Sequence, residues 1–108
     1  GAVIPVLPVT DTLKTVDASG VVVGTPRRSD MVAVQTPQGF RWDVLIRAHE
    51  EGASLGADEA RAATDDAGLV EAIGGTVHTV AGDERSMKVT RPIDLALAQI
   101  LVAEETSA

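Results

Sequence analysis

The sequence predicts a single α/β domain built on a partly parallel sheet. Short runs rich in valine and isoleucine alternate along the chain with longer segments whose apolar residues recur at helical spacing. The 108 residues are 44% hydrophobic, which indicates a folded chain with one modest core. Aromatic residues amount to one Phe and one Trp, so aliphatic side chains and alanine must supply that core.

The first third of the chain predicts a buried strand followed by a hairpin. Residues 2–9 are almost entirely apolar, and Pro5 and Pro8 are expected to confine this strand toward ends or bulges of the sheet. A turn at residues 17–20 separates two short strands. Because this segment has too few apolar residues for a core, we predict a projecting arm over about residues 11–32.

The middle of the chain predicts a second strand and a helix. The strand is expected at residues 31–35 and is ended by the sequence TPQGF. Spacing of i, i+3, i+4 and i+7 predicts that one helix face packs on the core, formed by Trp42, Leu45, Ile46 and His49. Gly52 is expected to stop this helix, and the small and charged residues 53–63 predict a mobile surface loop.

A third segment predicts a helix that begins with a polar cap. Thr64 can cap it, with Asp65 and Asp66 in the first turn, and glycines 74–75 end it. Adjacent aspartates on a helix point about 100° apart, which makes them poor partners for one metal ion. Capping is therefore the favoured interpretation of this pair.

The remaining residues predict a strand, a short extended segment and a final helix. The strand is expected at residues 76–82 and the extended segment at 86–90. The helix covers residues 90–105, with Thr90 as candidate cap and Pro92 in its first turn. Its shared apolar face would contain Ile93, Leu97 and Ile100.

Charge and composition exclude several classes of protein. A net charge of −7 with nine basic residues argues against general nucleic-acid binding. Because cysteine is absent, disulfides and thiolate sites are excluded, and a reducing cytoplasm is expected. The apolar opening is too short for a membrane span and lacks the basic residues of a signal peptide. Since the chain begins without methionine, we expect it to be part of a longer protein.

Residues suited to binding an anion lie at the ends of the predicted elements. Threonine hydroxyls, a lysine and paired arginines occur at 11–12, 27–28, 36–37, 64–66 and 87–92. In an open α/β sheet, ligands bind at such ends, and these groups suit a phosphate. The sequence has no glycine-rich phosphate loop. The alternative for each position is an ordinary solvated turn, and for the two histidines a packed or surface role.

Four of these segments, in this order, resemble the C-terminal half of the 2-C-methyl-D-erythritol 4-phosphate cytidylyltransferase family. They are PVTDTLK (8–14), AVQTPQGF (33–40), TDDAGLVE (64–71) and KVTRPIDLALA (88–98). The resemblance covers essentially the whole chain. It implies a Rossmann-like nucleotidyltransferase fold with a projecting β-arm used for dimerisation. The implied reaction joins CTP and methylerythritol phosphate in the non-mevalonate isoprenoid pathway, with release of pyrophosphate and with Mg²⁺.

The resemblance also implies site residues. The positions that match the family's methylerythritol-phosphate contacts are Thr12, Arg28, Thr36, Thr64 and Lys88. Lys88 is also the expected catalytic residue, and Arg28, at the base of the arm, is expected to act in the partner's site of a homodimer. Arg27 receives no role, since relatives often carry an acidic residue there.

Part of the family's machinery has no counterpart in this sequence. The glycine-rich loop that binds the triphosphate and the carboxylate that helps hold the metal belong to the family's N-terminal half. Mg²⁺ is therefore expected to be held mainly by residues outside this chain. Two alternatives stay open: a sister enzyme acting on ribitol phosphate, and a non-catalytic dimerisation module. No nucleic-acid or membrane partner is expected.

Overall fold

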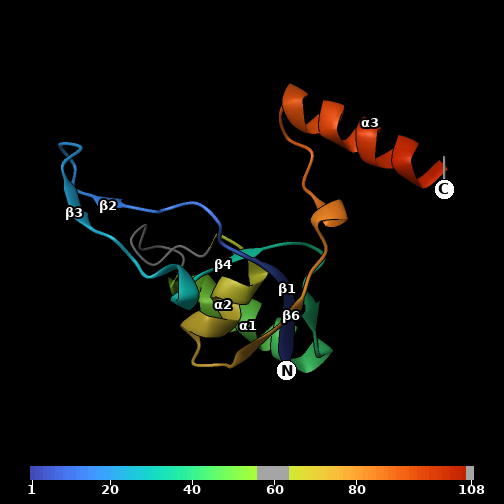
Figure 1. Ribbon diagram of the computed structural model, residues 1–108. Coiled ribbons are helices and arrows are strands. Elements are labelled where there is room, and N and C mark those ends of the chain that lie inside the picture. The colour runs from blue at the N-terminus through green and yellow to red at the C-terminus, as the bar shows by residue number, and fades with distance from the viewer. Residues whose placement is uncertain (56–63, 107–108) are drawn as a thin grey trace.

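The computed structural model describes residues 1–55 and 64–106, which form a mixed α/β structure (Figure 1). The strands are β1 (Ala2–Pro8), β2 (Thr15–Val16), β3 (Val22–Gly24), β4 (Val32–Val34), β5 (Gly39–Phe40) and β6 (Val77–Ala81). The helices are α1 (Trp42–Leu55), α2 (Asp66–Ala72) and α3 (Pro92–Thr106), with 3-10 turns at Arg28–Asp30 and Glu84–Ser86.

Strand β1 is the centre of the main sheet. Along one edge it pairs in parallel with β6, from Ala2 opposite Val77 to Val6 opposite Ala81. Along the other edge it pairs antiparallel with both β4 and β5, which lie opposite its last and first residues respectively. The predicted partly parallel sheet is thus confirmed. The TPQGF sequence does not simply end a strand, because Gly39 and Phe40 resume the pairing as β5.

The sequence QTPQ, residues 35–38, connects β4 to β5, and the antiparallel ladder is interrupted over residues 36–38. The last ladder bond before the interruption runs from the backbone N–H of Gln35 to the carbonyl of Pro5, over 2.9 Å. The N–H and C=O of one strand residue point to the same neighbour, so the donor that Pro5 lacks faces the interruption. Pro5 can therefore sit in the middle of a central strand. Pro8 ends β1, as expected, whereas Pro5 lies in mid-strand opposite the interruption of the ladder.

The core is small and lies between β1, α1 and α2. Ala2, Ala48 and Val70 are completely buried. The half-buried side chains packed around them are Phe40, Val44, Leu69, Ile73 and Val77. Gly52 belongs to this contact, because a Cβ there would lie 2.8 Å from Cδ2 of Leu69. The glycine therefore lets α1 and α2 approach each other, and α1 continues to Leu55 instead of stopping at Gly52 as predicted.

The buried face of α1 differs from the predicted one. Trp42 is 75% exposed, and the His49 side chain is 53% exposed. The residues that face the core are Val44, Ala48 and Gly52, at i, i+4 and i+8. The spacing of apolar residues predicted that large side chains of α1 would be buried. The buried residues are small ones, because they allow α1 and α2 to pack closely. Of the loop predicted at 53–63, residues 53–55 are helical, and 56–63 lie outside the described residues.

Helix α2 is capped by Asp65 and not by Thr64. The Asp65 backbone is extended, and its carboxylate Oδ1 accepts the N–H of Gly68 at 2.8 Å. Thr64 is thereby placed one residue before the cap, outside the helix. The hydroxyl of Thr64 is therefore not required for capping.

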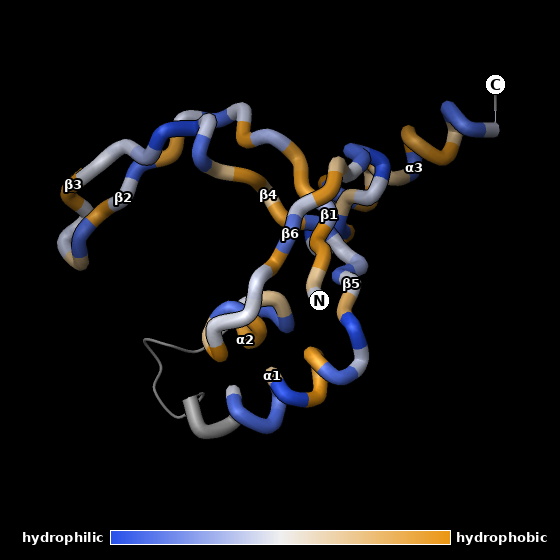
Figure 2. The backbone as a smooth tube through the Cα atoms, turned by 90° about the horizontal axis from the view of Figure 1, so that it is seen from below, coloured by the Kyte–Doolittle hydropathy of each residue, from blue (hydrophilic) through white to orange (hydrophobic). Residues whose placement is uncertain are grey.

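The β2–β3 hairpin projects from the sheet as a long arm (Figures 1 and 2). Its turn is the predicted one: the Asp17 carboxylate accepts the side-chain O–H and backbone N–H of Ser19 and the N–H of Val21. These bonds, led by the Ser19 hydroxyl, lower the pKa of Asp17. The arm's valines are 54–64% exposed, namely Val16, Val21, Val22 and Val23.

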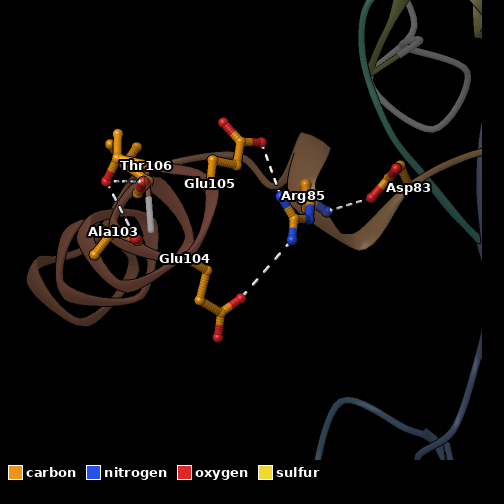
Figure 3. Close-up of polar contacts among 7 residues, drawn as sticks. Asp83, Arg85, Ala103, Glu104, Glu105 and Thr106 are labelled. Carbon is orange, nitrogen blue, oxygen red and sulfur yellow. Dashed lines mark hydrogen bonds and ion pairs between the residues drawn. The ribbon is translucent and has the colours of Figure 1, made fainter. Parts of the chain in front are cut away.

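Helix α3 also stands apart from the sheet in both views (Figures 1 and 2). Arg85 is directed toward its last turn, with Nη1 2.9 Å from Glu105 and Nη2 3.8 Å from Glu104, as Figure 3 shows. With the arm and α3 extended, the radius of gyration is 17.0 Å, against about 13 Å for a compact chain of this length. None of the described helices is long and apolar enough to cross a membrane.

The apolar side chains of α3 are largely exposed. They are 47–61% accessible and comprise Ile93, Leu95, Leu97, Ile100 and Val102. The helix itself was predicted, but within the described residues its expected apolar face does not pack into the core.

The start of α3 is held by a buried carboxylate. Asp94 accepts the backbone N–H groups of Thr90 at 3.2 Å and Arg91 at 3.0 Å, together with the Thr90 hydroxyl at 3.1 Å. The hydroxyl of Thr90, the predicted cap, therefore donates to the Asp94 carboxylate instead of accepting a backbone N–H of the helix. The two backbone bonds, Thr90's first, lower the pKa of Asp94 to about 2.

We predict that Asp94→Asn destabilises the start of α3 in a pH-dependent way. The folded pKa is about 2, below the ordinary 3.8, so the carboxylate stabilises the fold above pH 4. That contribution is lost as the pH falls from about 4 toward 2. Urea unfolding between pH 7 and pH 2.5 should show that wild type has the higher free energy of unfolding, and that its advantage over the variant narrows as the pH falls. Asp43→Asn, at a largely exposed carboxylate, should show a much smaller difference. A gap that stays constant with pH would contradict this account.

Candidate functional site

An open hollow lies between the end of the QTPQ segment and the beginning of α2. Its volume is about 470 Å³, and its lining comprises Thr36, Gln38, Phe40, Thr64, Asp65, Asp66 and Leu69. The structure thus brings together Thr36 and Thr64, two of the five residues predicted to bind the acceptor phosphate. They come from segments 28 positions apart in the sequence, so only the fold places them on one surface.

The side chain of Gln38 joins the two walls of this hollow. Its Nε2 donates to Oδ2 of Asp65 at 2.8 Å, and its Oε1 accepts the backbone N–H of Ala67 at 3.2 Å. Asp65 uses its other oxygen to cap α2 through Gly68. One half-buried amide is therefore bonded both to the cap and to the first turn of α2.

A histidine and an aspartate form a second link across the same region. His49 Nε2 of α1 lies 2.9 Å from Oδ1 of Asp66, at the start of α2. Both side chains are about half exposed. The contact is an ion pair when the imidazole is protonated and a hydrogen bond when it is neutral. It connects the α1–α2 pair at the rim of the hollow.

Gln35, at the other end of QTPQ, is bonded to a different segment. Its Nε2 donates to the Asp83 carbonyl at 2.8 Å, and its Oε1 accepts the Asp83 N–H at 3.0 Å. Gly82 makes this possible, since a Cβ there would collide with Oε1 of Gln35 and would lie 3.0 Å from the carbonyl of Val6. Asp83 in turn caps the 3-10 turn that leads to Lys88.

The other three predicted residues lie outside the lining of this hollow. Thr12 is exposed in the connection between β1 and β2. Arg28, in the 3-10 turn at the base of the arm, donates from Nη1 to the carbonyl of Thr10 at 2.7 Å, which brings it near the Thr12 segment. Lys88 is exposed between the 3-10 turn at Glu84–Ser86 and α3. Their roles stay predictions.

The lining of the hollow offers hydrogen-bond donors to an anion but no positive charge. Two threonine hydroxyls can donate hydrogen bonds, but the two charged lining residues, Asp65 and Asp66, are acidic. A phosphate bound here would need cations from other segments, such as those that carry Arg28 and Lys88. Among residues 1–55 and 64–106, no three His, Cys, Asp or Glu side chains gather as a metal site.

The two glutamines and the capping role of Asp65 were not anticipated from the sequence. Glutamine carries no periodicity or charge that marks it as structural. The only signal is its position, since one amide stands on each side of the Thr36–Pro37 dipeptide at the predicted end of a strand. Their partners, Asp65 and Asp83, are 27 and 48 positions away.

Known sequences resemble this chain along almost its whole length. The sequence model of the 2-C-methyl-D-erythritol 4-phosphate cytidylyltransferase family matches residues 1–104. A protein of that name from Rhodococcus jostii (strain RHA1) is 53% identical over 103 residues, which are 95% of this chain and 42% of that protein. Another from Nocardia farcinica (strain IFM 10152) is 56% identical over 101 residues, 94% of this chain and 40% of that protein. The chain thus spans about two-fifths of the length of these curated relatives.

Solved structures give the same result for the fold. The crystal structure of 2-C-methyl-D-erythritol 4-phosphate cytidylyltransferase from Thermus thermophilus superposes with a TM-score of 0.76 at 40% identity, covering 94% of this chain and 47% of that one. The 4-diphosphocytidyl-2C-methyl-D-erythritol synthase from Anaerococcus prevotii DSM 20548 gives a TM-score of 0.78 at 30% identity, over 94% and 46%. The α/β fold expected from the sequence is therefore confirmed.

We predict that Gly82→Ala displaces Gln35 from Asp83. The added methyl group would occupy the space of Oε1, so the variant loses two hydrogen bonds or shifts the backbone. The expected loss of unfolding free energy is about 1–3 kcal/mol, as for other overpacked sites. Gly39→Ala is the matched control, because its Cβ would lie 3.6 Å from the carbonyl of Val3, an ordinary contact. Urea unfolding of the natural protein that carries this chain measures both. Equal stabilities of the two variants would show that the close approach at Gly82 is unimportant.

Proposed function

Because the chain belongs to the 2-C-methyl-D-erythritol 4-phosphate cytidylyltransferase family, we propose that the natural protein carrying it transfers a cytidylyl group from CTP to 2-C-methyl-D-erythritol 4-phosphate. In this reaction an oxygen of the acceptor phosphate attacks the α-phosphorus of CTP. The bond from that phosphorus to the bridging oxygen breaks, and pyrophosphate leaves. The observation that carries the proposal is the family match over residues 1–104, and the meeting of Thr36 and Thr64 in one hollow supports it.

The proposed role of this chain is to bind and aim the acceptor phosphate. The hydroxyls of Thr36 and Thr64 line one surface, where they can donate to phosphate oxygens. Thr12 would add a third hydroxyl. Lys88 supplies the positive charge that this acidic hollow lacks, and it would stabilise charge during transfer. Such reactions depend mainly on positioning and electrostatic stabilisation, which is the work these residue types can do.

We also propose that the arm, residues 11–32, packs on a second copy of the chain, where Arg28 serves the partner's site. The exposure of four arm valines supports such an interface. Arg28 donates one of its five N–H groups to Thr10, which leaves others for a phosphate. The arginine is thus held at the base of the arm, from which it could reach outward.

We propose further that the protein uses CTP with Mg²⁺ and works in the non-mevalonate isoprenoid pathway of the cytoplasm. We assign the nucleotide and the metal mainly to residues outside this chain, since the sequence has no glycine-rich phosphate loop. Mg²⁺, when bound, would neutralise charge on the triphosphate. The direct test is an assay of the natural protein with CTP and either methylerythritol phosphate or ribitol phosphate. Turnover with ribitol phosphate alone, or with neither, would refute the proposal.

We predict that Lys88→Ala lowers kcat/KM for methylerythritol phosphate by about ten- to a hundredfold, the effect of losing a hydrogen bond to a charged group. Steady-state assays of the purified natural protein measure it. Arg47→Ala removes an exposed cation of α1, paired with Glu51, and should leave kcat/KM within about twofold. Unchanged kinetics of the Lys88 variant would mean that this lysine is an ordinary surface residue.

We predict that variants of Arg28 and Lys88 complement each other in mixed dimers. If Arg28 serves the partner's site while Lys88 serves its own, a dimer of one Arg28→Ala and one Lys88→Ala subunit has one intact site. Random reassembly of equal amounts makes about half the dimers mixed, so roughly a quarter of all sites are intact. The activity of the mixture is compared with that of each variant treated identically. If mass measurement confirms mixed dimers and activity does not rise, Arg28 acts within its own subunit.

A further inference from the structure

We propose that Gln38 is a positioning residue. It sets the placement of Thr64 relative to Thr36 in the hollow that both threonines line. This inference rests on the proposed function and adds to it a residue that does not itself bind the substrate. Its basis is the bonding of one amide to two parts of α2.

The covalent chain places Gln38 close to one threonine, and its hydrogen bonds place it close to the other. Thr36 is two residues before Gln38, on the segment that interrupts the ladder. Thr64 directly precedes Asp65, whose Oδ2 accepts from Gln38 Nε2. The second bond, from the N–H of Ala67, fixes the amide in orientation as well as in distance. Two bonds from one planar group thus define how the QTPQ segment faces the start of α2.

Apolar packing of Phe40 and Leu69 also joins these walls, but it does not involve residues 36–38. The sheet does not do so, because residues 36–38 are outside the paired strands β4 and β5. His49 and Asp66 join α2 to α1 and do not involve the QTPQ segment. Both of their side chains are about half exposed, where an ion pair contributes little. Gln38 is half-buried and has both of its polar atoms bonded, so it connects residues 36–38 directly to the start of α2.

The donor and acceptor pattern of this contact permits a test by reversal. In Gln38→Glu, a carboxylate oxygen replaces Nε2 and faces the carboxylate of Asp65, so the bond is lost and the charges repel. In Asp65→Asn, an amide nitrogen replaces Oδ2 and faces the nitrogen of Gln38, so two donors meet. In the double variant, the new amide at position 65 donates to the new carboxylate at position 38, which restores the bond with its direction reversed. Ala67 and Gly68 keep their acceptors, and the net charge equals that of wild type.

The experiment measures kcat/KM for methylerythritol phosphate and KM for CTP in the natural protein at pH 8. Each single variant should lower kcat/KM for the acceptor by about tenfold, the effect of one lost hydrogen bond. The double variant should recover to within about threefold of wild type, which is a positive coupling between the two positions. KM for CTP should stay within about twofold throughout. Gln99→Glu, at an exposed position of α3, adds the same charge away from the hollow and should change neither value.

Several outcomes would overturn the inference. Single variants with unchanged acceptor kinetics would show that the contact does not position the site. A double variant no better than its singles would show that the bond between positions 38 and 65 is not what places Thr64 relative to Thr36. If KM for CTP rose by the same factor by which kcat/KM for methylerythritol phosphate fell, the variant would have lost structure generally. Thermal melting of each variant would reveal such a loss. If Gln38→Glu fails to fold, Gln38→Met removes both bonds without charge and takes its place. A wild-type protein inactive with methylerythritol phosphate refutes the proposed function instead, and is recognised before any variant is made.

Discussion

The arrangement of the site depends on the interruption of the antiparallel ladder along β1 at residues 36–38, because the glutamines that flank Thr36 and Pro37 there bond to two distant segments. Backbone polar groups that leave a sheet must find other partners. A glutamine amide carries one donating and one accepting end, like a peptide unit, and can therefore bond an acceptor and a donor at the same time. Gln35 does this for the backbone of Asp83, and Gln38 does it for α2. The interruption thus becomes the point where three distant segments meet.

The helices beside this interruption are held by close packing of small residues. Gly52 allows α1 to approach Leu69 of α2, and Ala48 and Val70 are completely buried between them and the sheet. This packing fixes where α2 begins. Because Thr64 and Asp65 stand at that beginning, the core determines the position of one wall of the hollow. The surface ion pairs contribute little by comparison.

An acidic chain that is proposed to bind a phosphate must supply its cations locally. The hollow itself carries two carboxylates, one occupied by Gln38 and the Gly68 N–H and the other by His49. The cations proposed for the phosphate come from outside the lining of the hollow: Arg28 from the 3-10 turn at the base of the arm, and Lys88 from the segment before α3. The threonine hydroxyls that line the hollow and the cations proposed for the phosphate therefore come from different segments of the chain.

Elements whose signals lie within one stretch of sequence could be predicted before the structure was known. The apolar run of β1, the Asp17 turn and the α3 helix could be predicted because neighbours in sequence define them. Ordered motifs also identified the family, and with it Thr36 and Thr64 as candidates. The packing of the folded chain, in contrast, establishes which face of α1 is buried, since close helix packing favours Ala48 and Gly52 over Trp42. It also decided that Asp65 caps α2 and that Gln35 and Gln38 bind segments 27 to 48 positions away. Such contacts depend on the meeting of remote segments, and no periodicity or composition in one segment records the partner in another.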